Sequence, residues 1–377
     1  MDFDFTDDQE SLRDAVRRWV DKGFTFERRH AIAKAGGRTR DVYGELAELG
    51  LTGLAVPEAH GGMGFGAIEA MVVSEELGRG LVNAPYAQGA LIAPVLLSAA
   101  PAALQAAWLP KIADASALVV LAHQERAARY RLDHVTTAAT ASNGAWTVSG
   151  AKSVVPAGDE ANAFVVPARI SGAVDAPRGI GLFLVEKGAS GLAVRGYPTQ
   201  DGARAAELTL VSTPAALIAA EGLATLEHAV DAGIAALCAE GVGVMDKLVA
   251  LTAEYMNTRK QFGVPIASFQ ALRHRMADVK MQLELARSMS YFASLKMGEA
   301  APQRRRAIAQ AKVQLGQSMR FVGQQCIQLH GGIGVTDEYL GSHYFKRLTV
   351  MELSFGDTLH SLGEVSARMQ DTAGVFA

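Results

Sequence analysis

The chain has 377 residues, of which 49% are hydrophobic and 20% are charged, so it contains enough apolar residues for a large folded core. Its formal net charge is −3, from 36 basic and 39 acidic residues, so it lacks the positive excess with which proteins hold nucleic-acid phosphates. Its two cysteines, Cys238 and Cys326, form no C-x-x-C pair, which argues against a disulfide framework or a cysteine zinc site, and we expect no metal.

Residues 1–8 are acidic, unlike a signal or transit peptide. The apolar run over residues 91–104 is too short to span a membrane, and Pro94 and Pro101 interrupt it. We therefore expect a soluble, cytoplasmic protein that binds neither membranes nor nucleic acids.

Helical periodicity dominates residues 1–117, which we predict to be an N-terminal helical domain. Thr6 can cap the first helix, whose apolar face includes Val16. Apolar residues recur with helical spacing again in residues 42–51 and 68–77. These stretches are predicted to pack as an α bundle.

Short β-strands are predicted over residues 118–215, the middle domain. Residues 135–148 have the pattern of two paired strands, and Asn143-Gly144 between them supplies the positive φ angles of a tight hairpin turn. Further short apolar runs, separated by glycine and proline, lie at residues 164–166, 181–185 and 208–211. We expect a small antiparallel β domain.

The helical period returns in residues 222–377, and the predicted helices are long. Apolar residues recur every three or four positions from Phe269 to Leu283 and from Ile308 to Leu329. Long helices with short connections pack as antiparallel bundles. The chain is therefore predicted to be α+β and mostly α, with an N-terminal α bundle, a middle antiparallel β domain and a C-terminal four-helix bundle.

Four short segments carry a family resemblance. They are V-P-E-A-H-G-G at residues 56–62, E-E-L-G at residues 75–78, R-K-Q-F-G at residues 259–263 and Q-L-H-G-G-I-G at residues 328–334. Together and in this order they resemble the acyl-CoA dehydrogenase family, flavoproteins that oxidise the α,β bond of a CoA thioester. Within that family the sequence is most similar to the small-subunit type, such as the small subunit of pimeloyl-CoA dehydrogenase.

The resemblance implies an FAD site shared between two subunits, in which one subunit reaches the FAD of its neighbour. Here that trans half comprises Arg259, Lys260, Gln261, Phe269, Gln270, Gln328, Leu329, His330, Gly331 and Gly332. A guanidinium offers a rigid fork of donors to a pyrophosphate, and glycine lets a ligand approach the backbone. The resemblance also implies an acyl-CoA substrate, a dimer-of-dimers assembly and an electron-transfer flavoprotein as acceptor.

The cis half of the site departs from the family pattern. Where the family has T-E-P-G-S-G-S-D, residues 124–131 keep only Glu125 and gain arginines. Further along, Val154 replaces the tryptophan that shields the flavin, and Pro156 replaces the threonine that bonds its ring. Proline has no N–H to offer, so this half has lost several of its contacts.

The catalytic base is also changed. The reaction requires a carboxylate that removes a proton beside the thioester carbonyl, yet Phe355 and Gly233 occupy the family's two locations for it. Asp357 can replace the base, or it can cap the following helix; Glu352 is a weaker candidate. The backbone N–H of Phe355 can still hold the thioester oxygen, and Asp231 matches a substrate-contacting aspartate of the family.

Three interpretations remain open. In the first, the chain is the small subunit of a heteromeric acyl-CoA dehydrogenase and completes the FAD site of a larger partner. In the second, it is a self-sufficient homotetrameric dehydrogenase that uses Asp357 as its base. In the third, it is a non-catalytic scaffold or acyl-CoA-binding protein on the same fold. The first is favoured, because the trans half is intact in sequence while the cis half and the base are not.

Overall fold

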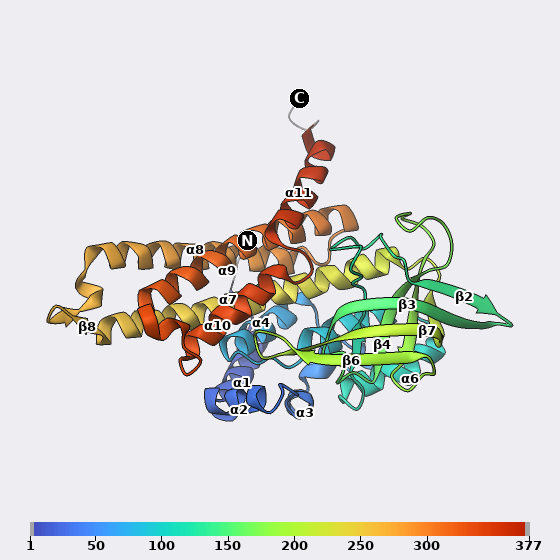
Figure 1. Cartoon of the computed structure of the whole chain (residues 1–377), viewed down its shortest axis with the longest axis horizontal. Helices are drawn as coiled ribbons and strands as arrows, with labels where there is room; N and C mark the ends of the chain where they lie inside the picture. The colour runs from blue at the N-terminus through green and yellow to red at the C-terminus, as the bar shows by residue number, and fades with distance from the viewer. Residues whose placement is uncertain (1–3, 374–377) are drawn as a thin grey trace. The chain divides into compact units, whose positions relative to one another are not determined.

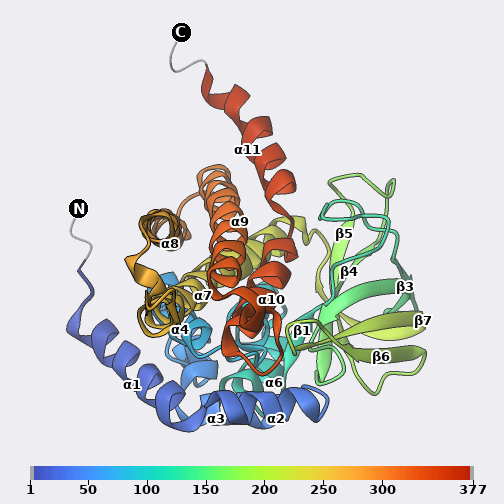
Figure 2. The same cartoon turned by 60° about the vertical axis from the view of Figure 1, so that its left-hand side comes forward.

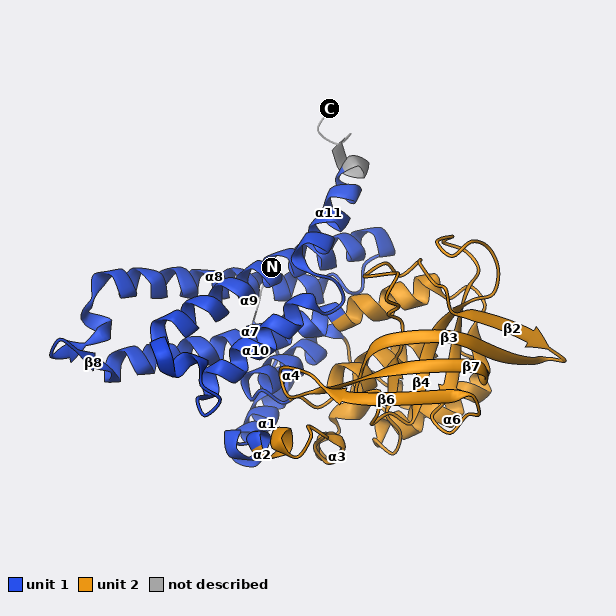
Figure 3. Cartoon of the chain, in the orientation of Figure 1, with its two compact units in different colours: residues 1–30, 67–82, 234–377 blue, residues 31–66, 83–233 orange. Residues whose placement is uncertain are grey.

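The computed structural model describes residues 4–373, and the side chains of residues 4–369. The chain forms two compact units (Figure 3). Unit 1 comprises Met1–His30, Ala67–Val82 and Ile234–Ala377, and unit 2 comprises Ala31–Gly66 and Asn83–Gly233. The predicted order of helical, β and helical segments along the chain is confirmed.

The first helix begins where its cap was predicted. α1 (Asp7–Gly23) follows Thr6, whose hydroxyl accepts the N–H of Gln9 at 3.3 Å, while the Gln9 side chain accepts the N–H of Thr6 at 3.1 Å. The helical segments that follow are α2 (Phe26–Lys34), α3 (Arg40–Glu48), η1 (Leu51–Gly53), η2 (Glu58–His60), α4 (Ala67–Arg79), η3 (Ala87–Ile92), α5 (Ala93–Leu97) and α6 (Ala102–Ala113).

Unit 1 contains the long helices of the carboxyl half (Figures 1 and 2). α7 (Leu223–Thr258) begins in unit 2 and runs on through unit 1. The elements after it are β8 (Lys260–Gln261), β9 (Val264–Pro265), η4 (Ile266–Ser268), α8 (Gln270–Leu295), α9 (Ala301–His330), η5 (Gly331–Val335), α10 (Leu340–Leu353) and α11 (Thr358–Ala373). α9 packs against α8, α10 and α11, so the predicted helical bundle is confirmed. None of the helices described is apolar enough over a sufficient length to cross a membrane.

Two glycines allow α4 and α7 to cross closely within unit 1. A Cβ added to Gly78 would lie 2.1 Å from the backbone oxygen of Glu240, and one added to Gly243 would lie 1.9 Å from that of Glu75. Two backbones that approach so closely leave no room for a side chain, which is why glycine stands at both positions.

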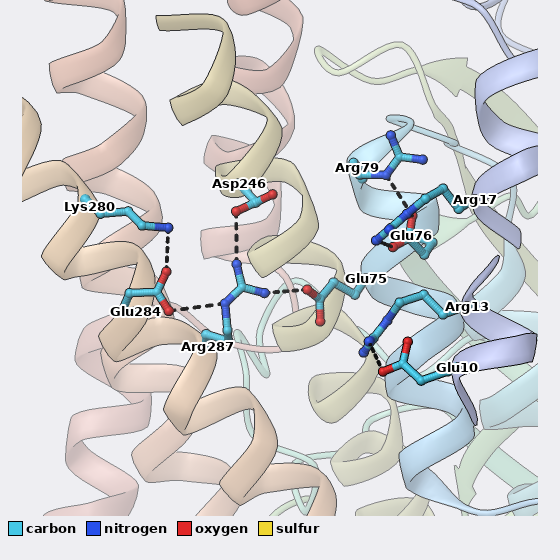
Figure 4. Close-up of polar contacts among 10 residues, drawn as sticks. All are labelled: Glu10, Arg13, Arg17, Glu75, Glu76, Arg79, Asp246, Lys280, Glu284 and Arg287. Atoms are coloured by element: carbon cyan, nitrogen blue, oxygen red, sulfur yellow. Dashed lines mark hydrogen bonds and ion pairs between the residues drawn. The ribbon is translucent and has the colours of Figure 1, made fainter. Parts of the chain in front are cut away.

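Ion pairs flank this crossing (Figure 4). The buried Glu76 carboxylate accepts hydrogen bonds from Arg17 of α1 at 2.6 Å and from Arg79 of α4 at 2.7 Å. Glu75 pairs with Arg287 of α8. The E-E-L-G segment therefore ties α1, α4 and α8 together and has a structural role of its own.

Unit 2 is built around a seven-stranded sheet. Its strands are β1 (Val119–Leu121), β2 (Ala138–Ser142), β3 (Ala145–Pro156), β4 (Ala163–Arg169), β5 (Ile180–Glu186), β6 (Leu192–Pro198) and β7 (Arg204–Ala219). β7 pairs with β3, β5 and β6, and the pairing of β4 with β5 closes the sheet on itself. These pairings are antiparallel, as predicted, whereas β1 and one residue of β2 pair with β4 in parallel.

The hairpin predicted at Asn143-Gly144 is confirmed. β2 and β3 are antiparallel partners on either side of it, and the two turn residues have φ angles of 51° and 80°. A two-residue turn of this kind needs positive φ at both positions, which Asn-Gly adopts readily, so the turn residues favour the observed register of this pair. The core inside the sheet includes Leu118, Val120, Val148, Phe164, Phe183 and Leu208.

Candidate functional site

The segment after α7 forms an exposed edge of unit 1. Arg259 follows the last residue of α7, and its N–H still donates to the carbonyl of Tyr255 at 2.8 Å. Lys260 and Gln261 form β8, and their pairing with β9 makes a small hairpin between the end of α7 and the start of α8 (Figure 1). The side chains of Arg259, Lys260 and Gln261 are exposed, and Phe262 at the hairpin tip is 93% exposed.

A small hydrophobic cluster brings the end of α9 to the same edge. Met256 of α7, Ile266 of η4 and Leu329 of α9 are buried together, and the half-buried Phe269 packs against them. Gln328 precedes Leu329 in the chain, so this cluster holds the two stretches of the expected trans half beside each other. We refer to residues 259–261, 269–270 and 328–332 as the cofactor edge.

The residues at the end of α9 divide into an exposed and a buried set. Gln328 is exposed, and a Cβ added to Gly331 or Gly332 would meet no atom within 4 Å, so the backbone there is open. Leu329 and His330 are only 6% and 3% exposed. Their side chains face the protein interior, and they reach the cofactor edge through their backbone alone.

The exposed set fits a dinucleotide with a diphosphate. Among residues 4–369, no acidic side chain forms an ion pair with Arg259 or Lys260. Their charges are therefore available to phosphate oxygens. The exposed amides of Gln270 and Gln328 can each donate and accept hydrogen bonds, as ribose and adenine require.

The expected cis half lies in unit 2, where Glu125 and Lys152 form a buried ion pair 2.7 Å long. The Glu125 carboxylate also accepts hydrogen bonds from the N–H and hydroxyl groups of Thr136 and Thr137. Burial alone would raise the pKa of Glu125, but the Lys152 charge and these hydrogen bonds lower that pKa to about 2. The pair is engaged within the protein, so it supports unit 2 rather than a ligand.

The backbone donors of β3 near this pair are not available to a flavin ring. Val154 has a φ of 50°, which is unusual for a β-branched residue, and its N–H donates to the Glu207 carboxylate at 3.2 Å. Glu207 also accepts the hydroxyl of Tyr197 at 2.8 Å, and Pro156 has no N–H. The carbonyl oxygens of a flavin need donors, so these residues do not fit the ring.

The turn between α10 and α11 contains the candidate catalytic residues. Phe355 has a φ of 57°, the left-handed conformation that side chains rarely adopt. The Asp357 carboxylate accepts the N–H of His360 at 2.7 Å, and its carbonyl accepts the N–H of Ser361 at 3.0 Å. This is N-cap geometry for α11, so the structure favours the capping interpretation of Asp357 over a role as base.

Buried polar groups flank this turn. Glu352 is 4% exposed and accepts the N–H and hydroxyl of Thr358 at 3.0 and 2.7 Å, so its carboxylate is engaged. Lys312 of α9 is fully buried and donates to the carbonyls of Met351 and Glu352 at 3.1 and 2.8 Å. Burial lowers the pKa of Lys312 to about 8. Lys312 was not predicted from the sequence, where its only signal is a lone charge among apolar helix positions.

The remaining candidate, Asp231, lies on the part of α7 that belongs to unit 2. Its side chain is 4% exposed. A direct substrate contact through this carboxylate therefore requires a local rearrangement around it.

A group of potential metal ligands that was not predicted from the sequence lies elsewhere in unit 1. The ligand atoms of His30, Asp337 and His343 all lie within 4.8 Å of one another. Arg29 lies 3.0 Å from Nδ1 of His343 and can only donate, and Lys346 pairs with Asp337 at 3.0 Å. Two cations beside the group oppose a metal ion, so we assign it no metal.

Comparison with known protein families gives matches along most of the chain. The model described as the N-terminal domain of acyl-CoA dehydrogenase matches residues 6–116, the middle-domain model residues 121–213 and the C-terminal-domain model residues 220–369. The probable acyl-CoA dehydrogenase YngJ of Bacillus subtilis is 27% identical over 94% of this chain and 96% of that protein. Acyl-CoA dehydrogenase FadE12 of Mycobacterium tuberculosis is 29% identical over 89% of this chain and 88% of that protein.

Solved structures give the same result. The Tcur3481-Tcur3483 steroid ACAD has a TM-score of 0.87 and 29% identity, over 97% of this chain and 99% of the matched chain. The ChsE4-ChsE5 complex from Mycobacterium tuberculosis has a TM-score of 0.89 and 25% identity, over 98% of this chain and 99% of the matched chain. Butyryl-CoA dehydrogenase from Megasphaera elsdenii, at 22% identity and a TM-score of 0.89, shows the shared fold over 98% and 100% of the two chains.

Proposed function

Because the chain belongs to the acyl-CoA dehydrogenase family of FAD-dependent oxidoreductases, we propose that it is the small subunit of a heteromeric enzyme and completes the FAD site of a larger partner. The observation that carries the proposal is the contrast between the two halves of the site. The cofactor edge presents open backbone and uncommitted basic side chains, whereas on β3 the Val154 N–H is already used and Pro156 has none. The small subunit of pimeloyl-CoA dehydrogenase is the type that this arrangement suits.

In this proposal the exposed residues of the edge bind the nucleotide part of the partner's FAD. Arg259 and Lys260 neutralise phosphate oxygens, while Gln261, Gln270 and Gln328 supply amide hydrogen bonds. Phe269, Leu329 and His330 shape the edge, and Gly331 and Gly332 expose its backbone. Bound FAD supplies the hydride acceptor for α,β-dehydrogenation of an acyl-CoA, which then takes place at the partner's own base.

The similar structures support an assembly of two kinds of chain, since two of them are named as pairs, Tcur3481-Tcur3483 and ChsE4-ChsE5. We propose a dimer of dimers, in which the predicted C-terminal domain of residues 222–377 provides the edge. We also propose an electron-transfer flavoprotein as the electron acceptor, as the resemblance to the family implies.

Purification from the native host, followed by an absorbance scan, tests the proposal. The chain expressed alone is expected to be colourless, and the complex isolated through a tag on this chain is expected to contain a larger family member and bound flavin. A yellow homomer with stoichiometric FAD would contradict the proposal. If that homomer were bleached by an acyl-CoA and Asp357→Asn abolished the bleaching, Asp357 would be the base, and the Phe355 N–H would stay the proposed donor to the thioester oxygen.

Arg259→Ala tests the edge itself. Loss of a charge-assisted hydrogen bond costs about 1.5–3 kcal/mol, so the Kd of the complex for FAD is expected to rise by roughly ten- to a hundredfold. Arg18→Ala is the matched control, because Arg18 is an exposed arginine on α1 with no ion pair among the described residues. If both variants retain FAD equally well, the edge does not bind it.

A further inference from the structure

His330 lies at the buried centre of an aromatic group beneath the cofactor edge. Its ring centroid is 4.6 Å from that of Tyr255 on α7 and 4.8 Å from that of Tyr339, the residue before α10. Three segments that are distant in the sequence therefore meet on one imidazole: the end of α7, the end of α9 and the start of α10.

The hydrogen bonds of His330 determine its tautomer. Nδ1 lies 2.7 Å from the backbone oxygen of Cys326, which can only accept, so Nδ1 carries the proton. Nε2 is then an acceptor, and the Tyr339 hydroxyl donates to it at 2.6 Å. Burial lowers the pKa of His330 and raises that of Tyr339 to about 12, so both groups stay neutral near pH 7. Both ring nitrogens are satisfied within the protein, and neither is left for a ligand.

Each neighbour of the imidazole continues directly into the edge. The carbonyl of Tyr255 accepts the N–H of Arg259. The backbone of Arg259 is therefore tied to the residue whose ring packs against His330. On the other side, His330 is the last residue of α9 and precedes Gly331, the C-cap residue, whose φ is 65°. A Cβ added to Gly334 would lie 3.1 Å from Cβ of His330, so η5 folds back tightly onto the histidine.

We propose that His330 is a positioning residue for the cofactor edge: through Tyr255 and Tyr339 it holds the Arg259 side and the Gly331–Gly332 side at a fixed separation. This inference rests on the proposed function, because the separation matters only to a ligand that contacts both sides. A dinucleotide is such a ligand, and it binds more weakly when its two contact groups move independently of each other. His330 thus acts without touching the ligand.

Two variants of different severity test the inference. Tyr339→Phe removes one hydroxyl and keeps the ring, whereas His330→Phe keeps a ring but removes both nitrogens. FAD is titrated calorimetrically into the flavin-free complex, and hydrogen exchange of the amides of residues 331–335 is measured on the full chain alone. We expect the Kd for FAD to rise about fivefold in Tyr339→Phe and about tenfold in His330→Phe, with similar increases in amide exchange.

His343→Phe is the matched control. His343 is a comparably buried histidine of unit 1, 5% exposed, whose ring hydrogen-bonds to Arg29 and Asp337 rather than to the cofactor edge. Its replacement is expected to lower the melting temperature without changing the Kd for FAD. An equal rise of the Kd in His343→Phe would show general destabilisation and would overturn the inference.

The remaining outcomes separate this inference from the proposed function. If Arg259→Ala weakens FAD binding while Tyr339→Phe and His330→Phe leave both the Kd and amide exchange unchanged, the edge binds FAD but His330 does not position it. If Arg259→Ala also leaves the Kd unchanged, the proposed function fails. Should His330→Phe not fold, Tyr339→Phe decides the question, because it removes a single hydrogen bond.

Discussion

Replacing Lys152 by methionine removes the cation that balances the buried Glu125 carboxylate in unit 2. The two side chains are 0% and 4% exposed, and the ammonium is the carboxylate's only cationic partner within hydrogen-bonding distance among the described residues. The pKa of Glu125 is lowered from 4.5 to about 2, and this difference corresponds to roughly 3 kcal/mol of folding free energy at neutral pH. Breaking a buried pair by removing one partner has a similar cost, about 3–5 kcal/mol. We therefore expect Lys152→Met to lose about 3 kcal/mol of stability at pH 7.

Urea denaturation followed by circular dichroism and tryptophan fluorescence measures this loss. The double variant Lys152→Met with Glu125→Gln removes both charges and is expected to recover part of the stability, because no unpaired charge stays buried and the two donors of one threonine still reach the amide oxygen. Lys187→Met is the matched control, since Lys187 is exposed and, among the described residues, donates only to the carbonyl of Asp159, and its stability change is expected to be small.

The pH dependence gives an independent check. A carboxylate with a lowered folded-state pKa contributes stability above its unfolded pKa of 4.5, and this contribution is lost as the pH falls toward about 2. Wild type should therefore lose stability over that window more steeply than Lys152→Met. An unchanged unfolding midpoint in Lys152→Met, or a double variant as unstable as the single one, would refute this account of the pair.

Three further features are each tested by substitution. Gly243→Ala places a Cβ where α4 and α7 meet, and we expect a loss of about 1–3 kcal/mol in urea denaturation, whereas Gly298→Ala, in open space, should be nearly neutral. Burial, and secondarily the Lys152 charge, lower the pKa of His123 to about 4. Between about pH 6.5 and 4, His123 is therefore protonated in the unfolded chain but neutral in the folded chain. Wild type should lose stability as the pH falls from about 6.5 toward 4, and His123→Gln should lose less in the same titration. Asp357→Ala should lower stability by about 1 kcal/mol and Asp357→Asn hardly at all, because asparagine caps helices as well as aspartate; loss of turnover in Asp357→Asn would instead indicate a base.

Features set by neighbouring residues were predictable from the sequence. The Asn143-Gly144 turn and the Thr6 cap depend on local backbone chemistry, and both are confirmed. The parallel pairing of β1 with β4 was not predicted, since it joins residues 119–121 to residues 163–165 and no local signal encodes that contact. β6, which alternates between exposed and half-buried positions, was also missed, because it has no continuous apolar run.

The direction of individual side chains was the main feature of the candidate site that the sequence left open. His330 and Gln328 belong to one short motif, yet one is 3% exposed and the other lies at the surface. The spacing of Cys326, Leu329 and His330 along one face of α9 is the signal that indicates burial of the histidine. Its partner Tyr339 lies beyond η5, so only the folded structure shows that the ring has an acceptor role.

In the proposed function, FAD binding and folding stability depend on different parts of this chain, and two substitutions separate them. Arg259 is exposed and forms no ion pair among the described residues, so Arg259→Ala should leave the unfolding midpoint within about 0.5 kcal/mol of wild type while weakening FAD retention by the complex. Lys152 is fully buried, so Lys152→Met should lower the midpoint while the surviving folded complex keeps its FAD affinity. Measuring the unfolding midpoint and the FAD affinity in both variants shows whether the edge binds the cofactor or only supports the fold. If Arg259→Ala lowers stability and FAD retention together, its side chain supports the fold, and the assignment of Arg259 to a partner's cofactor is wrong.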